Sequence, residues 1–361
     1  MRARTREWKR VAKLQAEMRR RKVDAFFVVR ASNLHYLFNF MPSSGFGIVW
    51  PDHAVFVTDF RYETAAQSAV RGAKVIIHRG TMMDELKKNR QLRLEGKVAI
   101  EADHMTVDFF EALKSYNPHA KLQPLVNVVE EIAACKEPEE LAKIQQAIKI
   151  TERVLSEMVG MLRPGLMEAD LATEVRYRHR KYGASGDSFD AIIASGKNSA
   201  LPHAEPGKKK IQKGDLVTFD IGCVYEGYAS DITRTFVIGK ATPKQRKIYD
   251  TVLRANQKAI RAAKAGMDGY ELDKVARDLI TKAGYGPKFG HGLGHGVGME
   301  VHAFPRVSRL VHAKLKPNMV VTIEPGIYIP GWGGVRIEDD ICIKRDGCEV
   351  MTSFPKELIE I

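Results

Sequence analysis

Two acidic residues interrupt strand-like apolar sequence in the middle of the chain. Asp220 stands in LVTFDIG and Asp231 in ASDITRTF, where uncharged side chains are expected. A buried carboxylate needs a compensating partner, because its charge is poorly solvated away from water. If the two segments form a hairpin about Tyr225 and Glu226, with Gly227 helping the turn, the two acids lie opposite each other on one face. Such a pair either binds a cation or forms a hydrogen-bonded turn, and both interpretations stay open for these two residues alone.

Later segments favour the cation. Glu324 in VVTIEPGIYI and Glu338 in GVRIEDD are again acids set into apolar strand sequence, and FGHGLGHGVGMEVH adds a cluster of histidines. Four carboxylates and one imidazole suit two divalent ions about 3.5 to 4 Å apart, which turn a bridging water into a hydroxide nucleophile near neutral pH. This set of four carboxylates and one imidazole therefore predicts a site for two metal ions. The histidines of the cluster are His291, His295 and His302.

The glycines between these histidines help to decide which metal-binding or nucleotide-binding motif the segment could form. Glycine at every second position from Gly290 to Gly298 does not fit a helical HExxH zinc motif, and His291-Gly-Leu-Gly-His295 lacks its glutamate. The segment contains no GxGxxG frame, and the chain contains no GxxxxGK[ST] loop. Glycine-rich backbone permits a close approach to a metal or substrate, although a structural role remains the alternative for any one histidine.

The composition is that of a globular protein large enough for two domains. The chain has 361 residues, of which 44% are hydrophobic and 28% charged. No run of eighteen or more apolar residues and no signal-type N-terminus is present, so we expect a cytoplasmic protein without a membrane partner. Four scattered cysteines without CxxC spacing predict reduced, structural thiols.

The positive charge is concentrated at the N-terminus. The formal net charge is +13, and residues 1–22 contribute +8 of it through ten Lys or Arg against two Glu. Apolar residues recur there at helical spacing, which predicts an amphipathic first helix with a basic solvent-facing side. A nucleic-acid partner is not favoured, because no RNA-binding signature, zinc finger or heptad run accompanies the charge. The apolar positions are Trp8, Val11, Ala12, Leu14 and Met18.

Two domains must position these residues. Up to about Asn127, short apolar runs alternate with helical stretches, which predicts an α/β domain over residues 1–135 and a boundary near Lys136. Helical sequence then extends to about Gly183, with Pro138 in a first turn and a break at residues 163–165, and a further helical pair covers 244–282. The β-branched segments around the acids predict an α+β domain over residues 136–361 with a mainly antiparallel sheet. The expected strands of the first domain are VDAFFVV, FGIVW, HAVFVT, AKVIIH and KVAIEA, and its helices are TAAQSAV, MMDELKKN and TVDFFEALKSY.

Nearly the whole chain resembles a known family, the pita-bread metallopeptidases of the Xaa-Pro dipeptidase (prolidase) and aminopeptidase P group. The first part is similar to the creatinase-type N-terminal domain through VDAFFVVRASNLHYLFNF and FVTDFRY, and KEPEEL resembles the linking helix. The second part follows the catalytic pattern in order. This resemblance implies a creatinase-type α/β domain and a pita-bread catalytic domain with a curved, mainly antiparallel sheet. The catalytic segments are SFDAIIASGKNSALPHAEPG, GDLVTFDIGCVYEGYASDITRTFVIG, GHGLGHGVGMEVH, TIEPGIYIP and GGVRIEDD.

The resemblance also implies a metal-ligand set, and all five positions are present. Asp220 would bind one metal, Asp231 and Glu338 would bridge both, and His295 and Glu324 would complete the second. Retained ligands argue against a creatinase and against an inactive relative. Oxygen ligands with one imidazole favour two Mn²⁺ ions, with Co²⁺ or Zn²⁺ as substitutes.

The family pattern further implies roles around the substrate. His302 would hydrogen-bond the scissile carbonyl or the tetrahedral intermediate, His203 and His291 would position the substrate, and Glu324 would shuttle a proton to the departing nitrogen. Arg336 is a candidate partner for a ligand or for a substrate carboxylate, and a plain structural or surface arginine remains the alternative. Ala303 departs from the family, which usually has an acid after this histidine, so either the groups around the metal ligands or the substrate preference are expected to differ while catalysis survives.

The predicted function is hydrolysis of the Xaa-Pro peptide bond in a small proline-containing peptide. An Xaa-Pro dipeptidase is favoured over an aminopeptidase P acting on longer peptides, because the chain lacks large insertions. A methionine aminopeptidase is disfavoured by the N-terminal domain and the SGKNSALPHAEP segment. A non-catalytic pita-bread binding protein is the remote alternative, and the family resemblance implies a homodimer.

Overall fold

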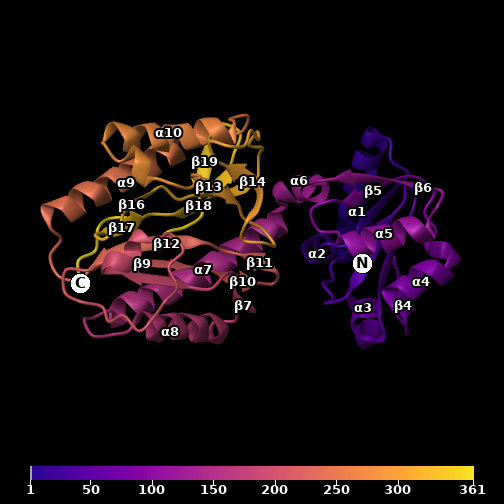
Figure 1. Ribbon diagram of the computed structural model, residues 1–361, viewed down its shortest axis with the longest axis horizontal. Helices are drawn as coiled ribbons and strands as arrows, with labels where there is room; N and C mark the ends of the chain where they lie inside the picture. The colour runs from indigo at the N-terminus through magenta and orange to yellow at the C-terminus, as the bar shows by residue number, and fades with distance from the viewer. Residues whose placement is uncertain (1) are drawn as a thin grey trace. The chain divides into compact units, whose positions relative to one another are not determined.

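The computed structural model describes residues 2–361, with side chains from Lys9 onward. Its contacts divide the chain into two compact units, Met1–Ala133 and Ala134–Ile361, and each is described by itself (Figure 1). The expected fold class of each unit is confirmed, because the first unit is α/β and the second combines helices with antiparallel sheets. Within residues 2–361, no helix is long and apolar enough to cross a membrane.

The first unit is built on one mixed six-stranded sheet with the strand order β4-β3-β2-β1-β5-β6. β1 pairs antiparallel with β2 and parallel with β5, and the pairs at both edges are parallel. Buried Phe27, Phe46 and Leu113 contribute to its core. The strands are β1 (Ala25–Val28), β2 (Gly45–Val49), β3 (Ala54–Asp59), β4 (Lys74–His78), β5 (Gly96–Glu101) and β6 (Ala120–Leu125). The helices are α1 (Arg2–Arg21), α2 (Ala31–Phe38), α3 (Glu63–Ala69), α4 (Met82–Lys88), α5 (Val107–Tyr116) and α6 (Val128–Ala134).

Two elements of this unit were not anticipated. β6 lies at the sheet edge, contains Pro124 and buries few of its side chains, so its sequence has no apolar run to mark it. α2 is short and ends at Asn39, which adopts a left-handed conformation with φ of 61°. The sequence pattern therefore underestimates short and peripheral elements.

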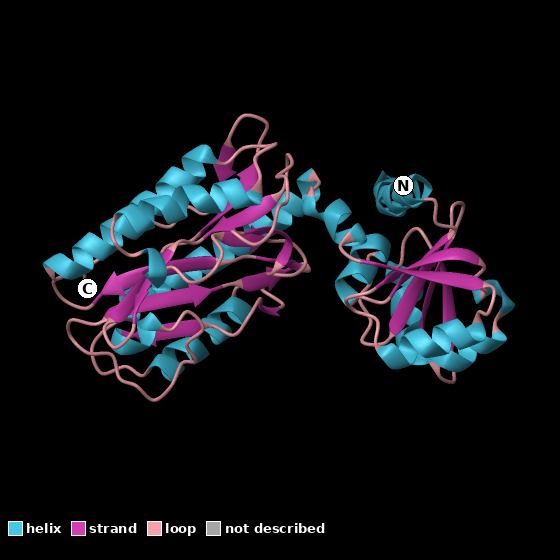
Figure 2. Cartoon of the chain, turned by 45° about the horizontal axis from the view of Figure 1, so that its top comes forward, coloured by secondary structure: helices cyan, strands magenta, loops and turns pink. Residues whose placement is uncertain are grey.

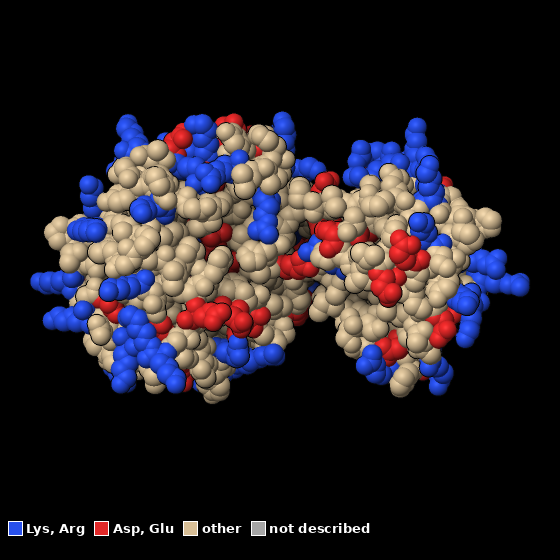
Figure 3. All heavy atoms as spheres, in the orientation of Figure 1, with Lys and Arg blue, Asp and Glu red and all other residues tan. Residues whose placement is uncertain are grey.

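The predicted amphipathic first helix is α1. Val11, Leu14 and Met18 are buried, whereas Ala12 is exposed and does not belong to the apolar face. The side chain of Trp8 lies outside the described residues. Figure 3 shows Lys and Arg side chains distributed over the visible face of both units rather than in one continuous stripe.

The second unit has two large hydrophobic cores among its described residues. One core packs α7 and α8 against the sheet β12-β9-β8, and the other packs α9 and α10 against β15, β16, β17 and β18 (Figures 1 and 2). Pro138 lies in the first turn of α7, as expected. All four cysteines are free thiols, two of them buried. The helices are α7 (Pro138–Met161), α8 (Glu168–Lys181), α9 (Pro243–Ala262) and α10 (Gly269–Lys282).

The strands of the second unit form four antiparallel groups. Their orders are β12-β9-β8, β11-β10-β7, β14-β13-β15-β18-β19 and β16-β17. Their bounds are β7 (Gly186–Asp187), β8 (Ile192–Ser195), β9 (Leu216–Ile221), β10 (Cys223–Tyr225), β11 (Tyr228–Ala229), β12 (Ile232–Val237), β13 (Gly294–Gly296), β14 (Ala303–Val307), β15 (Val320–Ile323), β16 (Gly326–Ile329), β17 (Gly333–Arg336), β18 (Asp339–Ile343) and β19 (Cys348–Val350).

The predicted hairpin forms, but its register is wrong by two residues. Asp220 pairs with Thr233 and not with Asp231. The turn is centred one residue later than expected, because Glu226 and Gly227 both adopt positive φ, 45° and 80°, as a type I′ turn requires. Since Asp231 is two residues from Thr233, it is a diagonal neighbour of Asp220, and the expectation that the two acids share a face stands.

The expectation that the acids lie within strands is correct only for Asp220. Asp231 directly precedes β12, Glu324 separates β15 from β16, and Glu338 separates β17 from β18. His295 lies in β13, so the glycine-rich segment is extended there and not helical. Residues just outside a strand do not take part in its regular hydrogen bonding. Their carboxylates can therefore turn toward one point from two different sheets.

Candidate metal centre

All nine predicted site residues line one cavity of the second unit, with a volume of about 630 Å³. β9 and the start of β12 supply two acids to it, and the segments around β13, β15 and β18 supply the remaining ligands. Segments more than 100 residues apart in the sequence therefore meet at this site. The nine residues are His203, Asp220, Asp231, His291, His295, His302, Glu324, Arg336 and Glu338.

The centre of the site is a buried group of three potential ligands. One ligand atom each from Asp231, His295 and Glu338 lie within 4.8 Å of one another. His295 Nε2 is 3.7 Å from Asp231 Oδ2, and Glu338 Oε2 accepts a 2.6 Å hydrogen bond from the Thr233 hydroxyl. The Gly296 carbonyl lies 3.1 Å from His295 Nδ1, which leaves Nε2 directed at the acids.

Glu324 and Asp220 flank this group. Glu324 Oε1 lies 3.3 Å from His295 Nε2 and accepts a hydrogen bond of the same length from Thr322. Asp220 binds the guanidinium of Arg336 through Oδ2, while its Oδ1 is buried without a hydrogen-bond partner among the described residues. Asp231 Oδ1 is likewise buried and unpartnered within residues 2–361. Buried oxygens of this kind are costly unless another group satisfies them.

The electrostatics of the cavity fit divalent cations. Burial raises the pKa of the Glu324 carboxyl to about 8, and the nearby charge of Asp220 adds to the shift. Burial and the neighbouring acids also raise the pKa values of Asp231 and Glu338 well above their usual range. Burial lowers the pKa of His295 to about 3, so its imidazole is neutral and can donate a lone pair. Oxygen ligands with one neutral imidazole match hard or borderline divalent ions, and such ions remove the repulsion.

The three remaining histidines differ in their surroundings. His291 Nε2 lies 2.9 Å from the Tyr328 hydroxyl, and burial lowers the pKa of this histidine to about 4. The ring of His302 is 4.5 Å from that of His295, and its pKa is lowered by burial and by the charge of Arg306. His203 is exposed at the cavity wall. The structure therefore brings all three to the cavity, at different depths.

Arg336 is not a surface arginine, since only 4% of its side chain is exposed. Besides Asp220, it donates hydrogen bonds to Thr233 at 3.0 Å and to the Tyr328 hydroxyl at 2.8 Å. These contacts place the Arg336 guanidinium against Asp220, a candidate ligand. Arg336 holds a candidate ligand and, through Tyr328, is connected to His291.

Two site residues escaped the sequence analysis. Tyr328 follows Glu324 in TIEPGIYI, but its contact with Arg336 comes from the pairing of β16 with β17. Arg306 is exposed, lines the cavity and has no ion pair with any acid in the described part of the chain. Because β14 pairs Arg306 directly with His295, their side chains share a face. Correct pairing of these strands would have been the signal for Arg306.

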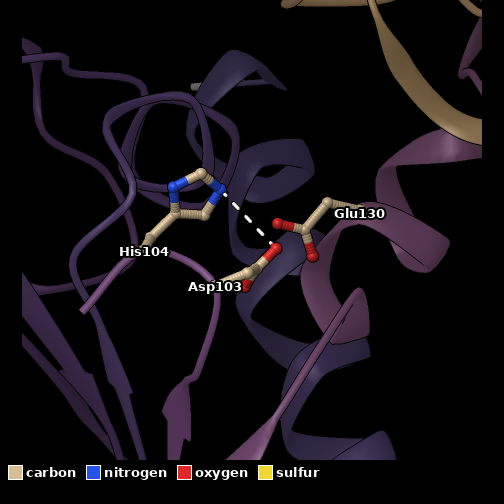
Figure 4. A group of neighbouring side chains, drawn as sticks. All are labelled: Asp103, His104 and Glu130. Atoms are coloured by element: carbon tan, nitrogen blue, oxygen red, sulfur yellow. Dashed lines mark ion pairs between the residues drawn. The ribbon is translucent and has the colours of Figure 1, made fainter. Parts of the chain in front are cut away.

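A second acidic group lies in the first unit, where Asp103, His104 and Glu130 approach one another (Figure 4). His104 Nε2 is 3.7 Å from Asp103 Oδ2. This group already contains a cation, because the Arg30 guanidinium lies 2.8 Å from Glu130 and 4.0 Å from Asp103. It therefore lacks the uncompensated negative charge of the cavity in the second unit.

Family models match both parts of the chain. Residues 142–345 match the model of metallopeptidase family M24, and residues 10–134 match that of the creatinase/prolidase N-terminal domain. The chain is 38% identical to an Xaa-Pro dipeptidase of Pyrococcus furiosus, over 97% of this chain and 99% of the relative.

Solved structures agree with these matches. An Xaa-Pro dipeptidase from Bacillus anthracis superposes with a TM-score of 0.94 at 38% identity and covers 98% of this chain and 100% of its own. An X-Pro aminopeptidase from Thermotoga maritima gives a TM-score of 0.87 at 35% identity, over 94% of this chain and 98% of its own. Both types of proline peptidase thus share the fold of this chain.

Proposed function

The chain belongs to metallopeptidase family M24, and from this premise we propose that it is an Xaa-Pro dipeptidase, or prolidase. It is a metal-dependent hydrolase that cleaves the peptide bond before proline. The observation that carries the proposal is the complete set of five ligand residues around one cavity, in a chain that matches Xaa-Pro dipeptidases over nearly its full length.

We assign two divalent ions to the cavity. Asp220 and His295 would each bind one ion, Asp231 and Glu338 would bridge the pair, and Glu324 would complete the second site. When bound, such a pair activates a water molecule and polarises the carbonyl of the scissile bond. The oxygen-rich ligand set favours Mn²⁺, with Co²⁺ or Zn²⁺ as substitutes.

The side chains of the cavity bind and orient the substrate. His302 lies beside His295 and is exposed at the cavity lining, where its ring can donate a hydrogen bond to the scissile carbonyl oxygen. His291 and His203, which also line the cavity, position the peptide. Glu324, whose Oε1 lies 3.3 Å from His295 Nε2, would take the proton that the attacking water releases and pass it to the departing proline nitrogen.

Proline explains why such a site is needed. The Xaa-Pro bond is a tertiary amide without an N–H, and the ring of proline restricts φ. A cleft that recognises its substrate through that backbone donor therefore binds proline peptides poorly. Here recognition would instead use the histidines and the apolar wall of the cavity, which includes Phe189 and Ile192.

Arg306 favours a dipeptide over a longer substrate. A dipeptidase must recognise the free C-terminal carboxylate of its substrate, whereas an aminopeptidase leaves that side of the cleft open. Arg306 offers a guanidinium at the cavity wall without an acidic partner in the described residues. Aminopeptidase P activity on longer peptides is the second candidate, supported by the likeness to the Thermotoga maritima enzyme.

We further propose a cytoplasmic homodimer with manganese as its native metal. The four free thiols suit a reducing compartment. Light scattering of the purified protein tests the dimer, and metal analysis of protein purified without added metal tests the manganese assignment. A monomeric mass, or stoichiometric zinc in place of manganese, would contradict the respective assignment.

The decisive experiment measures two products from the Mn²⁺-loaded protein. Release of free proline from Ala-Pro reports dipeptidase activity, and release of free alanine from Ala-Pro-Ala reports aminopeptidase activity. Asp231→Ala serves as the inactive control. We expect cleavage of the dipeptide only. Cleavage of the tripeptide supports the aminopeptidase, and inactivity on both substrates with metal bound refutes a proline peptidase.

A further inference from the structure

Glu168 is a fully buried carboxylate with no place in the metal cavity. It is the first residue of α8, and none of its surface is exposed. Burying a carboxylate away from water is costly unless hydrogen-bond donors surround it. The donors around Glu168 therefore indicate what the residue holds in place.

All of these donors belong to one segment, residues 195–207, which we call the His203 loop. Glu168 Oε1 accepts hydrogen bonds from the backbone N–H and the hydroxyl of Ser195, both at 2.7 Å. Oε2 accepts from the Asn198 side-chain amide at 3.0 Å and from the Gly207 backbone N–H at 3.4 Å. One carboxylate thus binds both ends of the loop and the turn between them.

The backbone of α8 reinforces the second end. Glu168 N–H donates to the Lys209 carbonyl and Ala169 N–H to the Gly207 carbonyl, each at 3.1 Å. Lys209 in turn donates to the Ser195 hydroxyl at 2.6 Å and to Asp215 at 2.9 Å. The first end of the loop is therefore held by a chain of hydrogen bonds that includes Glu168 as acceptor.

The centre of the loop forms one wall of the metal cavity. Pro202, His203, Ala204, Glu205 and Pro206 all line it. On its other side, the loop is attached to β17, because Gly334 N–H donates to the Ser199 hydroxyl at 2.9 Å. Between these two attachments, the Arg336 guanidinium donates to the Pro202 carbonyl at 3.4 Å, and exposed His203 has little packing of its own. The position of His203 then depends on the contacts that hold the loop, and Glu168 supplies those at its two ends.

We propose that Glu168 is a positioning residue for substrate binding, which sets the location of His203 by holding both ends of the His203 loop. The proposal rests on the proposed function, since it assumes that His203 binds the peptide substrate. Glu168 lies outside the ligand set, so its effect should fall on substrate affinity and not on metal affinity.

The test is Glu168→Gln. The amide of Gln can keep its oxygen toward Ser195, but its NH₂ group then faces the donors of Asn198 and Gly207, so one end of the loop is released. We expect KM for Ala-Pro to rise about tenfold, the effect of one charge-assisted hydrogen bond, with little change in kcat. Mn²⁺ affinity measured by calorimetry should stay at the wild-type value.

A further measurement and a matched control separate positioning from general destabilisation. Native trypsin digestion followed by mass spectrometry should show faster cleavage after Lys197 in Glu168→Gln than in the wild type. The matched control is Glu174→Gln, which changes a half-buried acid of the same helix, one that pairs with Arg178. The control should leave KM and the cleavage rate unchanged.

A double-mutant cycle provides the decisive comparison. If Glu168 acts through His203, Glu168→Gln should change KM much less in a His203→Ala background than in the wild type. Additive effects, or a loss of Mn²⁺ affinity equal to the loss of substrate affinity, would overturn the proposal. If Glu168→Gln does not fold, Asn198→Ala replaces it, because that change removes one donor and leaves the carboxylate bound to Ser195.

This design also distinguishes failure of the proposed function from failure of the inference. A wild-type enzyme inactive on Xaa-Pro peptides refutes the function, whereas an active wild type with unchanged KM in Glu168→Gln refutes the positioning role. Whether or not the wild type is active, the rate of trypsin cleavage after Lys197 reports how firmly the His203 loop is held in place.

Discussion

The buried carboxyl of Glu324 should destabilise the metal-free protein at neutral pH, because folding keeps it protonated, and Glu324→Gln should therefore stabilise the protein. Burial raises the pKa of this carboxyl to about 8, whereas the unfolded chain has an ordinary value near 4.5. Between these two values the folded state holds a proton that the unfolded state has lost, so stability falls as the pH rises. At pH 7 the difference amounts to about 3 kcal/mol.

Glutamine imitates the protonated acid that the metal-free fold already contains at pH 7. The substitution should raise the melting temperature of EDTA-treated protein by about 6 to 12 °C at pH 7, given the size of the second unit. At pH 5 the gain should fall below about 1 kcal/mol, because that pH is close to the unfolded pKa. With Mn²⁺ the sign reverses, because the variant has lost a charged ligand.

Differential scanning fluorimetry at pH 5 and pH 7, with EDTA or with Mn²⁺, measures all four conditions. Glu271→Gln, which changes an exposed acid of the same unit, is the control and should behave as the wild type does. A lower melting temperature for metal-free Glu324→Gln at pH 7, or an equal gain at both pH values, would refute the reasoning.

Three other substitutions test separate parts of the site. Arg306→Leu should raise KM for Ala-Pro at least tenfold with little change in kcat. Arg309→Leu, which lies outside the cavity lining, is the control and should leave KM unchanged. If Arg306→Leu and the wild type had equal KM values, Arg306 would not bind the substrate carboxylate. Tyr328→Phe leaves a buried donor of Arg336 unpartnered and should cost about 1 to 3 kcal/mol in urea unfolding, and a neutral result would contradict the contact. Arg234→Met leaves buried Asp339 without its guanidinium and should cost about 3 to 5 kcal/mol by the same assay; a cost below 1 kcal/mol would show that Lys356 suffices.

The candidate ligands could be singled out in the sequence because each of them contradicts its local context. Asp220, Glu324 and Glu338 are charged residues among apolar β-branched neighbours, and His295 stands among glycines. Such conflicts between residue type and pattern mark positions where another requirement overrides burial. The family resemblance then gave each residue an expected role, and the structure placed all of them at one cavity.

The register and the strand ends could not be predicted in the same way. Whether Asp220 faces Asp231 or Thr233 depends on Glu226 adopting positive φ, and nothing in its residue type requires that conformation. The breaks at Glu324 and Glu338 are also invisible to a pattern in which both flanking runs are apolar. Periodicity identifies strands, but the turn geometry decides which residues meet.

Contacts between distant segments were the least predictable part. Arg306 joins the site because β14 pairs with β13, and Tyr328 contacts Arg336 because β16 pairs with β17. Glu168 looks like an ordinary acid in the first turn of a helix, where a negative charge is favourable in any case. Its contacts with Ser195 and Gly207 arise only from tertiary packing.

The charge balance of the cavity explains why Arg336 stands within a candidate metal site. Three buried carboxylates and the partly buried Glu324 carry four negative charges when ionised, and two divalent ions would neutralise them. Arg336 then adds one positive charge close to Asp220, which favours an oxyanion in the cavity. In the metal-free protein the same guanidinium offsets part of the repulsion among the acids. Arg336 can therefore stabilise the empty fold and favour the charge that develops during hydrolysis, without binding either metal itself.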